Sequence, residues 1–67
     1  MQKPNRRELK VLREFAGTPE PWERFAGAGD STLKSLLEAG WICENTDLNY
    51  PAEYYEITPA GESAAYQ

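Results

Sequence analysis

Histidine is absent from this 67-residue chain, and cysteine occurs once, at Cys43. A single cysteine cannot form an internal disulfide. Without histidine it supplies neither a set of zinc ligands nor the base that usually activates a cysteine or serine nucleophile. We therefore expect no metal site, no cofactor and no enzymatic activity. Cys43 is interpreted as a small packing residue or a half-exposed thiol.

Long apolar segments are missing as well. No run of apolar residues is long enough to cross a membrane, and cations at Lys3, Arg6 and Arg7 follow Met1 where a secretory signal would become apolar. These features predict a cytoplasmic protein with no membrane partner. The short length predicts a single small domain over residues 1–67, whose core must use most of the large apolar side chains.

The charged residues are distributed unevenly along the chain, whose net charge is −4. Residues 1–13 carry five cations against Glu8, a net charge of +4. Residues 35–67 carry six carboxylates and no cation. If these two parts lie apart in the fold, the molecule is strongly dipolar, and its two ends attract different partners.

The first predicted helix begins near Arg6, because Asn5 followed by Glu8 is close to a capping-box pattern, and it ends at Gly17. One face of this helix is apolar and consists of Leu9, Val11, Leu12, Phe15 and Ala16. The opposite face carries Arg6, Lys10 and Arg13. This basic stripe is either an ordinary solvated surface or a contact for phosphate or an acidic protein.

Two further helices are predicted around a glycine-rich turn. Proline is tolerated in a first helical turn, which favours a short helix over residues 21–26, and the glycines of residues 27–29 then form a tight turn. Asp30 or Ser31 can cap the next helix, and Gly40 fits the left-handed residue that ends it. Its inward face is expected to consist of Leu33, Leu36 and Leu37. This order is the helix-turn-helix pattern.

A β-hairpin is predicted over residues 41–57, with alternating strand-like segments around a loop that contains Asp47, Asn49 and Pro51. In the first segment, Ile42 is expected to face one way, and Trp41 and Cys43 the other. Thr58 and Pro59 then cap and open a short C-terminal helix, in which Ala60 and Ala64 share a face. The predicted fold is therefore α+β, with three helices, a two-stranded hairpin and a short C-terminal helix. Its expected core is Leu9, Leu12, Phe15, Phe25, Leu33, Leu36, Leu37, Ile42, Tyr55 and Ile57.

Two stretches, LLEAGWI at 36–42 and YYEITPAGESAA at 54–65, resemble the winged helix-turn-helix domains of MarR-like and PadR-like regulators. In that family the second helix of the helix-turn-helix enters the DNA major groove and the hairpin forms the wing. The resemblance implies that the helix over residues 31–39 presents four residues to the bases: Ser31, Thr32, Lys34 and Ser35. Wing tips of the family usually carry arginine or lysine, whereas this hairpin carries carboxylates that would repel phosphate.

Two functions are consistent with these features. The first is a small winged-helix DNA-binding protein, either transcription-regulator-like or accessory, which binds double-stranded DNA through those four residues and the basic Arg6, Lys10 and Arg13. The alternative is an acidic winged-helix module, an adaptor or inhibitor that binds a basic protein surface. Its interface candidates lie on or beside the hairpin loop and are Glu44, Asp47, Tyr50, Glu53 and Tyr54. We rank DNA binding first, on the family resemblance.

Overall fold

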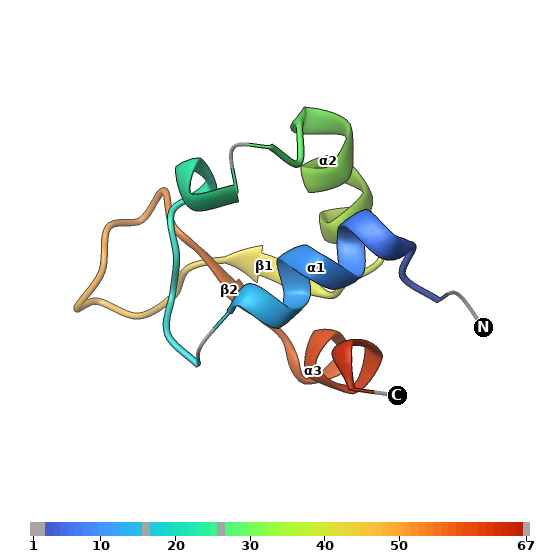
Figure 1. Ribbon diagram of the computed structural model, residues 1–67. Helices are drawn as coiled ribbons and strands as arrows, with labels where there is room; N and C mark the ends of the chain where they lie inside the picture. The colour runs from blue at the N-terminus through green and yellow to red at the C-terminus, as the bar shows by residue number, and fades with distance from the viewer. Residues whose placement is uncertain (1–2, 16, 26, 67) are drawn as a thin grey trace.

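The computed structural model describes residues 3–15, 17–25 and 27–66, and it contains three α-helices, one 3₁₀ turn and a two-stranded antiparallel hairpin (Figure 1). In chain order the elements are α1 (Arg6–Glu14), η1 (Trp22–Phe25), α2 (Asp30–Glu38), β1 (Ile42–Glu44), β2 (Tyr55–Ile57) and α3 (Pro59–Ala65). The small α+β class is thereby confirmed, and the arrangement is compatible with a winged helix.

Helix α1 begins as its sequence predicts. The Asn5 side chain accepts a hydrogen bond from the Glu8 amide at 2.8 Å, and the Glu8 carboxylate accepts one from the Asn5 amide at 2.8 Å, which completes the capping box. The predicted end at Gly17 is wrong, because the backbone becomes extended at Phe15. This change of direction lets the Phe15 ring pack on Phe25, with ring centroids 5.1 Å apart. Ala16, predicted to face inward, lies outside the described residues.

The helix predicted over residues 21–26 is reduced to the single 3₁₀ turn η1, and its last residue lies outside the described part of the chain. The segment before η1 is fixed by the hairpin instead. Glu20 and Tyr55 exchange two backbone hydrogen bonds of 2.8 Å and form an isolated antiparallel bridge. In the hairpin itself, Ile42 lies opposite Ile57, and Glu44 lies opposite Tyr55.

Helix α2 starts at Asp30, and the predicted caps Asp30 and Ser31 are wrong. The N-cap is Gly29, whose φ of 82° places it in the left-handed region, and no side chain caps the helix. The predicted left-handed C-terminal residue is confirmed, since Gly40 has a φ of 77°. Leu36 is fully buried (0% exposed), but Leu37 is 36% exposed, so its assignment to the core is wrong. Helix α2 turns its Thr32 and Leu36 side inward instead.

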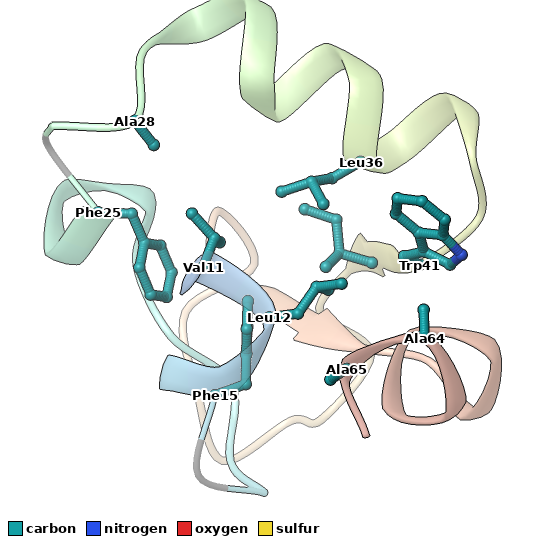
Figure 2. Close-up of a cluster of buried hydrophobic side chains, with 10 residues drawn as sticks. Val11, Leu12, Phe15, Phe25, Ala28, Leu36, Trp41, Ala64 and Ala65 are labelled. Carbon is teal, nitrogen blue, oxygen red and sulfur yellow. The ribbon is translucent and has the colours of Figure 1, made fainter. Parts of the chain in front are cut away.

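The core lies where α1, α2, the hairpin and α3 meet, and Figure 2 shows its side chains converging from all of these elements. Its buried apolar residues are Val11, Leu12, Phe15, Phe25, Ala28, Leu36, Trp41, Ile42, Ala64 and Ala65. Five residues of the predicted core are confirmed as buried: Leu12, Phe15, Phe25, Leu36 and Ile42. Four others are only partly buried: Leu9, Leu33, Tyr55 and Ile57.

Trp41 is buried, although the alternation of the sequence placed it on the face opposite Ile42. It precedes β1, so strand alternation does not apply to it, and its indole lies toward Ala64 of α3 (Figure 2). Helix α3 is capped as predicted, because the Thr58 hydroxyl accepts from the Gly61 amide at 3.0 Å. Ala60 is exposed, however, and α3 packs through Gly61, Ala64 and Ala65.

Leu36→Ala should lower the free energy of unfolding by about 2–5 kcal/mol, because it removes a fully buried side chain from the centre of the core. Leu37→Ala is the matched control on the same helix, and we expect it to cost far less. Chemical denaturation followed by circular dichroism measures both. If both variants lowered the free energy of unfolding equally, Leu36 would not be more buried than Leu37, and the orientation of α2 described above would be wrong.

Gly61→Ala should destabilise the fold, because an added Cβ atom would lie 2.0 Å from the Trp41 carbonyl oxygen, a backbone atom that cannot rotate away. Overpacking of this kind costs about 1–3 kcal/mol, which outweighs the better helix propensity of alanine. Gly27→Ala is the control, since its Cβ would meet no atom within 4 Å. A thermal melt in which Gly61→Ala matched the parent chain would exclude this close approach of α3 to Trp41.

Candidate functional site

An open groove of about 920 Å³ runs between α1 and the segment from Arg24 to Ser35. The buried residues of its floor are apolar at Val11, Phe25 and Ala28 and polar at Glu8 and Thr32. Its rim carries cations from two elements, namely Arg6, Arg7 and Lys10 of α1 and Arg24 of η1. The groove thus joins a basic edge to the N-terminal half of α2.

The charge balance of this rim is positive. Arg6, Arg7 and Lys10 are exposed. The Arg24 side chain is 52% exposed and lies 3.7 Å from the carboxylate of Glu20, whose side chain is only 13% exposed. Glu14 is the exposed carboxylate among the groove residues, since Glu8 is buried. A surface with this balance attracts anions, above all the closely spaced phosphates of a nucleic acid.

Glu8 connects the two helices at the base of the groove. The residue is only 4% exposed, and its two carboxylate oxygens accept hydrogen bonds from different partners: the Asn5 amide at 2.8 Å and the Ser35 hydroxyl. Hydrogen bonds thus satisfy a buried charge, as burial requires. The capping role of Glu8 was predictable, but its link to Ser35, 27 residues away, left no signal in the sequence.

Five of the seven predicted DNA-binding residues line this groove: Arg6, Lys10, Ser31, Thr32 and Ser35. Two of the five do not have the exposure that was expected of them. Thr32 is buried (8% exposed), because α2 turns this side toward the interior. Ser35 is half-buried, and its hydroxyl is used by Glu8. The outer face of α2 therefore consists of Asp30, Ser31, Lys34, Leu37 and Glu38.

The remaining two candidates lie outside the groove. Lys34 is exposed on α2, between the carboxylates of Asp30 and Glu38 along the helix. Arg13 is exposed too, but its Nε atom donates a 2.9 Å hydrogen bond to the Ala65 carbonyl oxygen and so ties α1 to the end of α3. The structure therefore gives Arg13 a part in holding the fold together.

The predicted protein-interface residues form a separate surface around the hairpin loop. Glu44, Tyr50 and Glu53 are exposed, whereas Asp47 and Tyr54 are half-buried. The Asp47 carboxylate accepts from the Asn49 amide at 2.9 Å, so part of its hydrogen-bonding capacity builds the loop. Sequence reasoning missed Leu48 at the tip of this loop, whose relative exposure is 101%.

Cys43 is half-buried on β1, and its sulfur lies 3.7 Å from a carboxylate oxygen of Glu56. Partial burial raises the pKa of the Cys43 thiol, and the charges of Glu56 and Glu44 raise it further. Both effects disfavour the thiolate, which is the form that attacks substrates and binds metals. The surroundings of Cys43 suit a packing residue.

Within the described ranges, no group of three or more histidine, cysteine, aspartate or glutamate side chains is placed to hold a metal ion. No helix among the described residues has the length and apolar character needed to cross a membrane. Comparison of the chain with protein-family models, curated proteins and solved structures finds no match.

Ser35→Ala should lower the free energy of unfolding by about 1–3 kcal/mol, because it leaves a buried carboxylate oxygen of Glu8 without its hydroxyl donor. Ser31→Ala is the control, since Ser31 is exposed on the same helix. Both are measured by urea denaturation. If the two serine variants were equally stable, the hydrogen bond between Glu8 and Ser35 would have no part in joining α1 to α2.

Proposed function

We propose that this chain is a small winged-helix DNA-binding protein, transcription-regulator-like or accessory, which holds double-stranded DNA against the groove between α1 and α2. The observation that carries the proposal is the groove itself. It brings the exposed cations of α1 and the exposed start of α2 to one surface, although the two lie about 20 residues apart in the chain.

The chemistry of the two edges differs in a way that suits a duplex. Arg6, Arg7 and Lys10 offer charge to phosphates, which supply most of the affinity in protein–DNA contacts. Ser31 and Lys34 on the exposed side of α2 offer a hydroxyl and an ammonium group, both of which bind base edges. Helix α2 has nine residues and is thus about 14 Å long, and an α-helix is narrow enough to enter a major groove, which is about 12 Å wide.

The binding is expected to be weak. Asp30 and Glu38 flank Lys34 on the outer face of α2, and the hairpin adds Glu44 and Glu53 as exposed carboxylates. Their repulsion of phosphate keeps the hairpin off the backbone, so this wing does not make the usual cationic contact of the family. We expect roughly two to four phosphate contacts, and a correspondingly shallow dependence of affinity on salt.

The alternative function, an acidic module for a basic protein surface, would use the hairpin and leave the groove free. A single exposed substitution separates the two functions. Glu53→Lys removes repulsion near the phosphates and should tighten duplex binding, whereas it should slow association with a basic protein. Glu53 suits this test better than Asp47, whose carboxylate helps to build the loop.

Lys10→Ala and Arg7→Ala should each weaken binding to a duplex and lower the slope of log affinity against log salt by about 1. Lys3→Ala is the control, because it removes an exposed cation that does not line the groove and leaves the contact of Arg13 with α3 intact. Fluorescence anisotropy of a labelled duplex over a salt series measures the slopes, with circular dichroism to verify that each variant is folded.

If the parent chain shows no binding to any duplex at low salt, the DNA proposal is excluded. If Lys3→Ala lowers affinity as much as Lys10→Ala does, the loss reflects net charge, and the groove is not the site.

A further inference from the structure

The hairpin loop between β1 and β2 presents an apolar tip within an acidic surround. Leu48 is fully exposed, and its neighbours Tyr50, Pro51 and Ala52 are exposed as well. Glu44 and Glu53 lie exposed at the two sides of the loop. Figure 1 shows the loop extending well beyond the sheet, away from the N-terminal end of α1. A group of apolar and aromatic side chains rimmed by carboxylates has the composition of an interaction surface.

This loop is held in one shape by its own hydrogen bonds. The Asn45 side-chain amide donates to the carbonyl oxygens of Asp47, Tyr50 and Pro51 at 2.9, 3.2 and 3.1 Å. The Asn45 side-chain oxygen in turn accepts from the Asp47 amide at 2.8 Å. A loop that is already ordered loses little conformational entropy when it binds, so a contact through Leu48 carries only a small entropic penalty.

A surface complementary to this tip exists on the same molecule. The groove between α1 and α2 combines apolar floor residues, Val11 and Phe25, with the cationic rim of Arg6, Arg7 and Lys10. No described residue of the 45–54 loop is among those that line the groove, so the loop of one molecule does not cover its own groove. The loop tip of one molecule, with Leu48 between carboxylates, is therefore complementary to the groove of another copy of the chain. That groove has apolar residues on its floor and cations on its rim.

We propose that the chain associates with itself head to tail, with the 45–54 loop of one molecule docked in the α1–α2 groove of the next. Leu48 lies over the apolar residues of the floor, and Glu44 and Glu53 face the cations of α1. Because the two contacting surfaces are different, the contact is heterologous and forms short chains of molecules instead of a two-fold dimer. The proposal rests on the same groove as the proposed function, so self-association and DNA compete for the same cations.

Sedimentation velocity from micromolar to millimolar protein at low salt tests the proposal. The average mass of the parent chain should rise with protein concentration and fall as salt screens the charges. Leu48→Ser should hold the protein monomeric, whereas Leu37→Ser, which removes an exposed leucine outside both surfaces, should leave association unchanged. A monomeric parent chain at every concentration, or equal effects of the two leucine variants, would overturn the proposal.

A charge-swap mixture then tests whether the loop meets the groove. Arg7→Glu/Lys10→Glu makes the groove acidic, and Glu44→Lys/Glu53→Lys makes the loop basic; all four positions are exposed, so the fold should tolerate the changes. Each double variant alone should be monomeric, because its loop and groove then carry like charge. Mixing the two should restore association. A mixture that stayed monomeric would overturn the pairing of loop with groove.

DNA titrations with Leu48→Ser separate this proposal from the proposed function, because that variant keeps the groove intact. A parent chain that binds duplex but stays monomeric overturns self-association alone. A chain that associates but binds no duplex overturns the DNA function alone. If the protein both associates with itself and binds duplex, added duplex should dissociate the head-to-tail assemblies of the parent protein.

Discussion

The buried carboxylate of Glu8 sets the relation between the two helices on which the rest of the molecule depends. One of its oxygens completes the cap of α1, and the other accepts the hydroxyl of Ser35 in the middle of α2. A charge that is 4% exposed remains stable only while both partners stay in place. Glu8 therefore fixes the start of α1 against the middle of α2, beside the groove that these two helices line.

The parts of the fold that could be predicted are those whose cause is local. The cap of α1, the left-handed Gly40 and the Thr58 cap depend on residues within a few positions of each other, and the sequence showed all three. The rotation of α2 could not be predicted, because Thr32 and Leu37 are both compatible with an inward face until the direction of α1 is known. Trp41 was misplaced because strand alternation was applied one residue before the strand begins.

In the candidate site, too, features with a local cause could be predicted, and features that depend on tertiary contacts could not. Exposure of Arg6 and Lys10 followed from the helical period, which places them opposite the apolar side of α1. Their position beside Ser31 could not be predicted in this way, because it depends on the tertiary packing of α1 against α2. Ser35 illustrates the limit most clearly: a polar residue on a helix is equally consistent with a ligand contact and with a partner for a buried charge. Leu48 was missed because the sequence interpretation concentrated on the charges and tyrosines around it.

The bridge between Glu20 and Tyr55 makes the hairpin and the segment that leads into η1 depend on each other for stability. Because these residues exchange two backbone hydrogen bonds, β2 cannot separate from its neighbours without releasing the segment that leads into η1. The ring of Trp22 lies 6.4 Å from that of Tyr55, so the same opening would also break an aromatic contact. The amide protons of Glu20 and Tyr55 should therefore become exposed in one cooperative opening, with a common free energy of opening.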